Sequence, residues 1–220
     1  MQSLIDSHYP KGLAQDGFSD GLQAAIRRLF RYWFNRLETL APEIAGAFLH
    51  RSMSHTDKAF LSALRSAGLT VRFTQTEATR RAFDVALSGN VGLIRSIGQQ
   101  YLSRVEDSVW RSVNAGYTMS QLSKELRKDF GVSERRAAFI ARDQTNKAKA
   151  VIEKVRRQEL GITEAIWLHS HAGKEPRPSH VAANGKRFDV SKGMYLDGKW
   201  VQPGEEINCR CSSRAVIKWG

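Results

Sequence analysis

The sequence predicts a mainly α protein with a small α+β C-terminal domain, and three observations lead to that class. Apolar residues recur at helical spacing through roughly the first 160 residues. After Gly161, glycines and prolines accumulate and short alternating runs replace the helical pattern. The 220 residues are 41% hydrophobic and 25% charged, a composition typical of globular domains. We therefore expect a helical N-terminal bundle, a long connecting helix and short antiparallel strands at the C-terminus.

The first predicted helix begins after Ser19, a candidate N-cap, and ends at about Leu40, because Pro42 follows. Further helices are expected over about 41–49 and 56–67. The first of these helices carries a wide apolar stripe, which predicts a face packed in a bundle. Its members are Leu22, Ile26, Leu29, Phe30, Trp33, Phe34 and Leu37.

The next predicted element is a long helical region that Thr76 caps and that ends at Asn114. Gly89 and the asparagine after it indicate a break within this region. Residues 1–115 are accordingly assigned to a helical N-terminal region.

A helical hairpin is predicted over residues 118–160. Thr118 is expected to cap its first helix, and Gly131 to stop that helix. A second helix is expected to begin near Ser133 and to continue to Leu160, with apolar residues along one face.

The small α+β module is predicted over residues 161–220, and with the hairpin it forms a domain over 116–220. Gly161 is the expected left-handed terminator of the preceding helix. Asp197 and Gly198 form a typical hairpin turn. The expected strands cover residues 163–169, 186–190, 194–196, 199–201 and 214–219.

The charge is strongly positive: 34 Lys and Arg stand against 22 Asp and Glu, a formal net charge of +12. Such a balance favours a polyanionic neighbour, namely nucleic acid, an anionic membrane or an acidic protein surface. The excess is spread along the chain, which favours generic contact with DNA phosphates over one base-reading element. The residues predicted to lie near DNA are Arg135, Arg136, Arg142, Lys147, Lys149, Lys154, Arg156 and Arg157.

Several function classes lack their sequence signals. The N-terminal residues do not resemble a signal peptide, and no run of 18 apolar residues indicates a membrane span. Glycine-rich phosphate-binding loops are absent. The C-terminal carboxylates are scattered among turns, as solvated loop charges are, so a metal-dependent nuclease is not expected. These carboxylates are Glu175, Asp189, Asp197, Glu205 and Glu206.

The predicted hairpin leaves a helix-turn-helix regulator as an alternative function. Basic residues surround the turn at Gly131, and a recognition helix would present Ser133, Arg135 and Arg136 to the major groove. The length of the second helix disfavours this reading, because recognition helices are short.

Histidines and cysteines form a second set of interest, with the pattern H-x-H, then His180, then C-x-C. Two cysteines and two histidines suffice for a tetrahedral zinc site, and cysteines two apart on a strand share a face. The alternatives are two buried thiols in a small core, or a cysteine nucleophile with His180 as its base. The candidate ligands are His169, His171, His180, Cys209 and Cys211.

Three segments stand out together: ARDQTNKA over 141–148, WLHSHAGKEPRPSHVAANGKRF over 167–188 and PGEEINCRC over 203–211. In this order they resemble the phage Mu F-type head morphogenesis (minor head protein) family. The second segment is similar to the family's signature, the third to its terminal motif, and the first to the helix that precedes the signature. The resemblance covers about residues 116–215. The matching positions are Arg142, Asn146, Trp167, Arg177, His180, Gly185, Phe188, Pro203, Cys209, Arg210 and Cys211.

The resemblance implies a minor head (capsid-associated) protein of a tailed phage or prophage. Family members take part in head morphogenesis and in DNA packaging or ejection, with the portal protein, the major capsid protein and packaged double-stranded DNA as partners. The implied location is the virion, in the head interior or near the portal, and the host cytoplasm during assembly. Members are not generally enzymes, so no catalytic residue and no cofactor is expected, with structural zinc left open. The alternatives are the helix-turn-helix regulator and a zinc- or cysteine-dependent enzyme.

On this reading the motif holds a small domain together. Arg177 or His180 is expected to bridge to backbone carbonyls or to Asp189. Gly185 permits a positive-φ turn, and the Cys-Arg-Cys strand closes the small sheet against Trp167.

Overall fold

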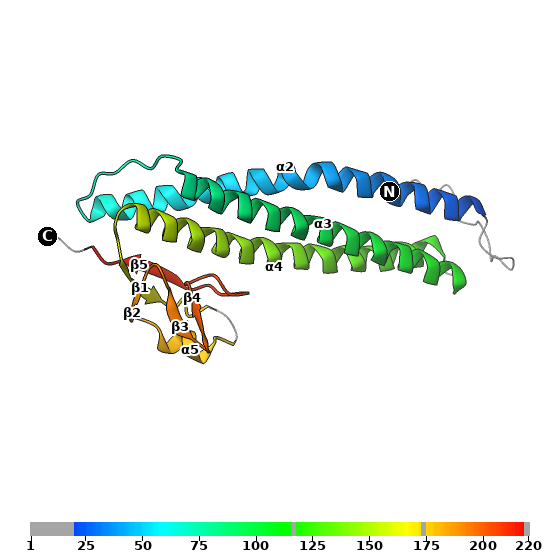
Figure 1. The fold of residues 1–220 in the computed structure, drawn as a ribbon. Helices are drawn as coiled ribbons and strands as arrows, with labels where there is room; N and C mark the ends of the chain where they lie inside the picture. Colours follow the sequence, from blue (N-terminus) through cyan, green and yellow to red (C-terminus); the bar gives the residue numbers. More distant parts are fainter. Residues whose placement is uncertain (1–19, 116–117, 173–174, 218–220) are drawn as a thin grey trace. The chain divides into compact units, whose positions relative to one another are not determined.

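Three long helices precede a group of short strands in the computed structural model, which describes residues 20–115, 118–172 and 175–217. The helices are α2 (Asp20–Ser66), α3 (Glu77–Asn114) and α4 (Met119–Glu159) (Figure 1). The predicted fold class is confirmed. The predicted N-cap Ser19 lies outside the described residues.

The chain divides into two compact units, each of which takes parts of all three helices. Unit 1 comprises residues 1–45 and 90–138, and unit 2 comprises 46–89 and 139–220. The domain boundary between residues 115 and 116 stays a prediction.

Three predicted helix breaks are wrong. Pro42 lies inside α2 and Gly89 lies inside α3, and both helices continue through them. The helices expected over 41–49 and 56–67 are likewise parts of the continuous helix α2. A proline removes one backbone hydrogen bond and a glycine costs about 1 kcal/mol in a helix. Ala41 and Ala45 beside Pro42 are fully buried, so packing on that side of the helix offsets the local cost.

Unit 1 has an apolar core to which each of the three helices contributes. Two residues from each helix form the buried cluster, and Phe30, Trp33 and Tyr101 pack against it. Helices α2 and α3 approach closely, because a Cβ placed on Gly98 would overlap the Leu37 side chain. The buried cluster consists of Ile26, Leu29, Val105, Val109, Leu122 and Leu126.

Helix α4 is continuous from Met119 to Glu159, so the predicted hairpin at Gly131 is wrong. Gly131 is not among the glycines with positive φ and adopts the helical conformation. The helix-turn-helix alternative required this hairpin and loses its structural basis, because the described chain has no turn at Gly131. The predicted cap at Thr118 is confirmed: its backbone N–H donates to Gln121 Oε1 at 2.7 Å, and its hydroxyl accepts the Gln121 N–H at 3.4 Å.

The cap of α3 is also confirmed, since the Thr79 N–H donates to the Thr76 hydroxyl at 3.2 Å. At the other end of α4, Gly161 has φ 67°, as predicted for a left-handed terminator. The N–H of Ile162 donates to the carbonyl of Arg157 at 2.9 Å, which closes the helix end.

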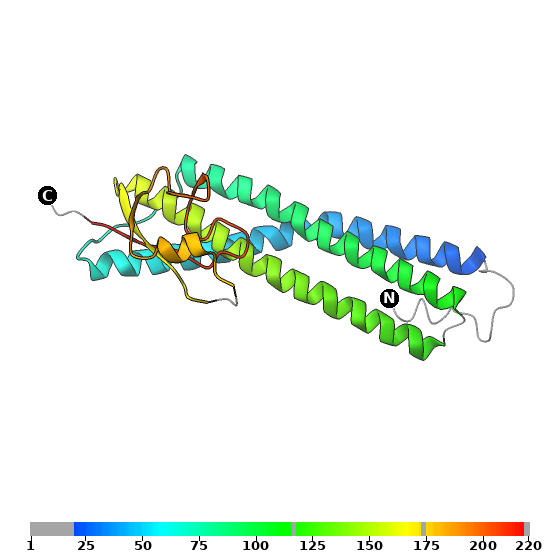
Figure 2. The ribbon, with the colours of Figure 1, turned by 90° about the horizontal axis from the view of Figure 1, so that it is seen from below.

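The strands of unit 2, labelled in Figure 1, form two small antiparallel groups, and Figure 2 shows the short helix α5 (Pro178–Ala182) of the same unit in orange. One is a three-stranded sheet in the order β2-β1-β5, and the other is the hairpin β3-β4. Asp197 and Gly198 turn the hairpin with φ values of 49° and 82°, as predicted. The elements are β1 (Glu164–Leu168), α5 (Pro178–Ala182), β2 (Arg187–Asp189), β3 (Met194–Leu196), β4 (Lys199–Val201) and β5 (Ser212–Ala215).

The strand β5 begins two residues before the predicted start and ends at Ala215. Its four residues pair with β1, with Trp167 opposite Ser213. The part of the predicted strand beyond residue 217 lies outside the described residues.

The short strands and α5 form the strand module, defined as the described residues 161–172 and 175–217. Its core is built around Trp167, which is fully buried. The indole ring packs edge-on against Phe188, with ring centroids 6.1 Å apart. The buried cluster around Trp167 comprises Ala165, Trp167, Ala183, Phe188, Val190, Val201, Cys209 and Cys211.

Among the described residues, no helix is long and apolar enough to cross a membrane.

Candidate functional site

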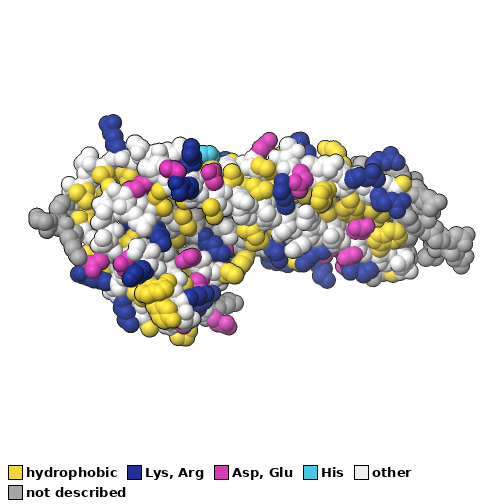
Figure 3. Space-filling view, viewed as in Figure 1, with side chains coloured by type: hydrophobic (Ala, Val, Ile, Leu, Met, Phe, Trp, Pro, Cys, Tyr) yellow, Lys and Arg dark blue, Asp and Glu magenta, His cyan; other side chains and the backbone are white. Residues whose placement is uncertain are grey.

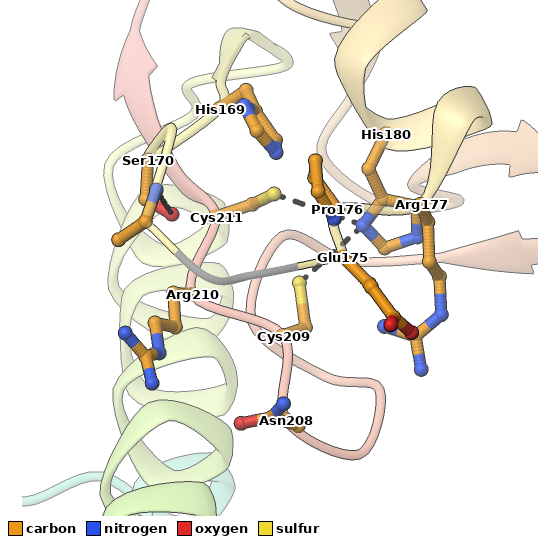
Figure 4. Close-up of a pocket in the computed structure, with 11 residues that line it drawn as sticks. His169, Ser170, Glu175, Pro176, Arg177, His180, Asn208, Cys209, Arg210 and Cys211 are labelled. Atoms are coloured by element: carbon orange, nitrogen blue, oxygen red, sulfur yellow. Dashed lines mark hydrogen bonds between the residues drawn. The ribbon is translucent and has the colours of Figure 1, made fainter.

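Three buried ligand-type side chains meet inside the strand module. His180 projects from α5, and Cys209 and Cys211 lie on the extended stretch before β5 (Figure 4). The sulfur of Cys209 lies 3.5 Å from His180 Nδ1, and that of Cys211 lies 3.7 Å from the same nitrogen. Cys209 is 3% exposed, Cys211 is 8% exposed and His180 is 2% exposed. Both sulfurs face the same nitrogen, as expected, but the predicted Cys-Arg-Cys strand is wrong, because the strand β5 begins only at Ser212.

Helix α4 holds the cysteine segment in place through two side chains. Asn146 Nδ2 donates to the carbonyl of Cys209 at 2.9 Å, and the backbone N–H of Asn208 donates to Asp143 Oδ1 at 2.6 Å. Both bonds satisfy backbone groups that no strand partner reaches. The family-motif position Asn146 is therefore a structural clamp, and Asp143 is a second clamp that the sequence analysis did not identify.

Gly204 is required where the chain turns toward the cysteines. Its φ is 89°, and an added Cβ would lie 3.2 Å from the Asn146 carbonyl oxygen and 3.3 Å from that of Cys211. Any side chain at this position would therefore be strained and crowded by backbone on two sides. Pro203, the motif residue before it, is buried.

Glu206 orients the His180 ring. Its Oε2 lies 2.9 Å from His180 Nε2, and its side chain is only 13% exposed. Lys199 forms an ion pair with the same carboxylate, and Arg177 Nε lies 3.6 Å from it. The hydrogen bond from Lys199 is the main reason that the pKa of Glu206 is lowered from 4.5. Because this carboxylate accepts the Nε2 proton, the lone pair of Nδ1 points to the thiols.

One expectation is wrong here, because Glu206 is a largely buried partner of His180 and not a solvated loop charge. The expectation that Arg177 or His180 bridges to a backbone carbonyl or to Asp189 is confirmed for Arg177, since its Nη2 donates to the carbonyl of Ile207 at 3.0 Å. Gly185 has the expected positive φ of 78°.

The two thiols have opposite acidities. The pKa of Cys209 is lowered to about 5, first by a hydrogen bond from Cys211 and further by backbone N–H donors at Cys211 and Gly204 and by His180. The pKa of Cys211 is raised, first by that same bond and then by burial. Trp167 and the backbone N–H of Ser170 act in the opposite direction on Cys211. The pair thus loses its first proton readily and holds its second.

A cavity of about 520 Å³ opens beside the three side chains. His169 lines it, and Figure 4 shows its ring directed toward the space in front of Cys211. His171 does not line it and stacks edge-on against His169, with ring centroids 4.7 Å apart. The Arg210 side chain points away from both sulfurs (Figure 4). Four of the five candidate ligands therefore surround one space, and His171 does not.

The predicted DNA-proximal residues all lie on α4, but two of them are buried. Arg156 forms ion pairs with Asp57 at 2.8 Å and with Glu159 at 3.0 Å. Arg157 pairs with Glu153 at 2.9 Å and donates to the carbonyl of Ser213 at 3.1 Å. Both arginines are 3% exposed, so assigning them to DNA contact is wrong.

The other six basic candidates reach the surface to different degrees. Arg135, Arg136 and Arg142 are exposed. Lys147 is half-buried and pairs with Asp143 at 2.8 Å, while Lys149 lies 3.7 Å from Glu153. Lys154 is half-buried, as is Arg210 in the strand module.

Comparison with known proteins gives one family and one relative. The family model described as "Phage Mu protein F like protein" matches residues 103–214, which include all of α4 and the strand module up to the third residue of β5. A Haemophilus influenzae (strain ATCC 51907 / DSM 11121 / KW20 / Rd) protein, described as uncharacterized, is 28% identical over 199 residues. The aligned part is 89% of this chain and 43% of that relative, so the chain spans less than half of its length. No solved structure matches significantly.

Proposed function

This chain belongs to the family of Phage Mu protein F like proteins, and from that membership we propose that it is a minor head protein of a tailed phage or prophage. Its proposed role is in head assembly: it binds the portal or major capsid protein and contacts packaged DNA without sequence specificity. The match over 103–214 is the observation that carries the proposal. The proposed role is non-catalytic, and the proposed location is the virion, with the host cytoplasm as the place of assembly.

The roles of the family-motif residues support a structural reading. Asn146 clamps the cysteine segment, Trp167 forms the module core, and Arg177 fixes a loop carbonyl. Each of these interactions positions backbone or fills the core of a small module. Such a module presents a rigid surface to partners.

The exposed aromatic pair on the hairpin β3-β4 is the proposed docking feature of that surface. Tyr195 and Trp200 are 59% and 56% exposed, and their rings pack edge-on at 5.4 Å between centroids. Exposed aromatic residues are enriched at the centres of protein interfaces, because they bury large areas on binding. We assign this pair to contact with the portal or capsid protein.

The proposed DNA contact is a basic stripe on α4, defined as Lys128, Arg135, Arg142 and Lys149. A spacing of seven residues places them on one helix face, about 10.5 Å apart along the axis. Arg135 and Arg142 are exposed, and neither forms an ion pair with the residues that the structure describes. On the face drawn in Figure 3, Lys and Arg are spread among Asp and Glu, which is consistent with contact that does not depend on base sequence.

The stripe is tested by measuring DNA affinity against salt concentration. We expect a steep loss of affinity with salt and little difference between DNA sequences. The double variant Arg135→Gln/Arg142→Gln should lower the slope of log affinity against log salt by about 2, since each phosphate contact contributes about 1. The control Arg51→Gln/Arg65→Gln removes the same charge from exposed positions on α2. Salt-insensitive binding, or an equal loss in both double variants, would contradict the stripe.

Incorporation into particles tests the head assignment itself. Heads purified from the encoding phage should contain the chain, at far fewer copies than the major capsid protein, as quantitative peptide mass spectrometry measures. The variant Tyr195→Ser/Trp200→Ser should be soluble and folded but depleted from heads. Val85→Ser is the control, because Val85 is an exposed apolar residue on α3. Absence of the wild-type chain from mature heads and from assembly intermediates would refute the proposal.

A further inference from the structure

We propose that Cys209 Sγ, Cys211 Sγ and His180 Nδ1 bind one Zn²⁺ ion, which fastens the strand module together. This site goes beyond the head-protein function and does not depend on it. The three ligand atoms lie within 4.8 Å of one another, and all three residues are buried. Two thiolates and an imidazole are a ligand set that zinc prefers.

The distances between ligand atoms suit tetrahedral coordination. Zinc–sulfur bonds of about 2.3 Å and zinc–nitrogen bonds of about 2.05 Å place S and N about 3.6 Å apart at the tetrahedral angle. The observed distances from His180 Nδ1 are 3.5 Å to the Cys209 sulfur and 3.7 Å to the Cys211 sulfur. Both nitrogen–sulfur distances therefore match those of a tetrahedral zinc site.

A metal satisfies this arrangement better than hydrogen bonds among the side chains do. Both sulfurs approach the same nitrogen, and one imidazole lone pair accepts one good hydrogen bond. Zinc binding replaces the thiol protons and gives each of the three atoms a bond. It also neutralises the negative charge of two buried thiolates, which are costly to bury alone.

The groups around the ligands are those that a zinc–thiolate site requires. Glu206 accepts the Nε2 proton of His180, so the carboxylate fixes the ring with Nδ1 available to metal. The clamp from Asn146 holds the segment that carries both cysteines.

The fourth coordination position faces the cavity and is assigned to water. His169 lies nearby, but its Nδ1 accepts the backbone N–H of His171 at 3.1 Å. The neutral ring then carries its proton on Nε2, so the nitrogen toward the cavity is a donor and not a ligand. His169 therefore serves as a hydrogen-bond donor to the metal-bound water.

A cysteine nucleophile is the competing interpretation of the same atoms, because Cys209, His180 and Glu206 form a thiol–imidazole–carboxylate series. A nucleophile needs contact with substrate, whereas Cys209 is 3% exposed. The two interpretations differ in one measurable property. A zinc-bound thiolate resists alkylation until the metal is removed, and a catalytic thiolate reacts without chelator.

Metal content of the full chain tests the site. Protein produced in zinc-supplemented medium and purified without chelator should retain one zinc ion per chain by native mass spectrometry. Adding Co²⁺ to the reduced, metal-free chain should produce the near-ultraviolet charge-transfer absorption of cobalt–thiolate bonds. Iodoacetamide should label both cysteines many-fold faster after chelation than before it. Absence of bound zinc together with absence of the cobalt–thiolate band would overturn the proposal, as would rapid alkylation of Cys209 in zinc-supplemented protein.

Matched variants identify the ligands. Cys209→Ser, Cys211→Ser and His180→Gln should each lose zinc, whereas the control His171→Gln should retain it. His171 packs against His169 outside the cavity, so this variant reports on general damage to the region. His169→Gln tests the water assignment and should also retain zinc, because it removes a hydrogen-bond donor and not a ligand. If a cysteine variant does not fold, the cobalt spectrum and the alkylation rates of the wild-type chain still decide the question. Retention of zinc by folded His180→Gln protein would refute the ligand set, and loss by His169→Gln would refute the water assignment.

Discussion

The core of unit 1 and the strand module of unit 2 are stabilised in different ways. In unit 1, three long helices bury leucine, isoleucine and valine side chains from apolar stripes. The strand module has strands of only three to five residues, and its buried cluster includes two cysteines and two alanines. Half of the eight members of that cluster are therefore small side chains, each of which buries less apolar area than a leucine or an isoleucine does.

Buried polar contacts with α4 provide the additional stability of the strand module. Arg157 donates to Ser213 on β5, Asn146 donates to the carbonyl of Cys209, and Asp143 accepts from Asn208. Buried polar groups stabilise a fold only when each has a partner, so these bonds demand particular residues at particular places. We therefore expect unit 1 to tolerate exchanges among apolar side chains, and the strand module to depend on single polar side chains.

The largest loss in the free energy of unfolding is expected from breaking the contact of α4 with β5. Arg157→Met removes a buried charge that pairs with Glu153 at 2.9 Å and with Ser213 Oγ at 2.8 Å. Because Glu153 then loses a buried partner, the free energy of unfolding should fall by about 3–5 kcal/mol. Urea denaturation followed by tryptophan fluorescence measures it. Arg142→Met, at an exposed position of the same helix, should change it by less than about 0.5 kcal/mol. Equal effects of the two substitutions would contradict the structural role of Arg157.

A somewhat smaller effect is expected in the apolar core of unit 1. Leu122→Ala creates a cavity at a fully buried position and should cost about 2–5 kcal/mol. Leu122→Met keeps most of the volume and should cost less than about 1.5 kcal/mol. Circular dichroism during urea denaturation measures both values. A similar cost for methionine and alanine would show that unit 1 requires particular side chains as the strand module does.

Periodicity and end signals predicted much of the fold. The long helices, the caps at Thr76 and Thr118, the terminator Gly161 and the hairpin turn at Asp197 all follow from local chemistry. The predicted breaks at Pro42, Gly89 and Gly131 were wrong, because each local cost is small beside the packing of a long helix. Local signals therefore locate the ends of elements better than they locate interruptions.

The candidate site was predicted in part, for a related reason. His180, Cys209 and Cys211 were identified by residue type, but their supporting groups Glu206 and Asp143 were not. Glu206 is 26 residues from His180, and Asp143 is 65 residues from Asn208, so no local spacing connects either pair. The partner of Arg156, Asp57, is 99 residues away, which is why a buried ion pair looked like surface charge.

The smallest expected change in stability concerns the turn after β2, where an exposed carboxylate accepts hydrogen bonds from the next residues of the chain. Asp189 Oδ1 accepts the backbone N–H of Ser191 at 2.7 Å and its hydroxyl at 2.5 Å. The pKa of Asp189 is lowered from 3.8, first by the hydroxyl of Ser191 and then by its backbone N–H. A lowered pKa in the folded state means that the carboxylate stabilises the fold above pH 3.8, and that this contribution is lost as pH falls through the lower, folded value.

Asp189→Asn removes this titration and keeps an oxygen that accepts the same backbone N–H. Between about pH 6 and about pH 2, the wild-type chain should therefore lose slightly more stability than the variant. Urea midpoints measured across that range test the difference. Asp84→Asn removes the same charge from an exposed position of α3 and is the control. Parallel acid profiles for the wild type and Asp189→Asn would show that the turn is held by backbone geometry alone, and the polar dependence of the strand module would then be confined to its contacts with α4.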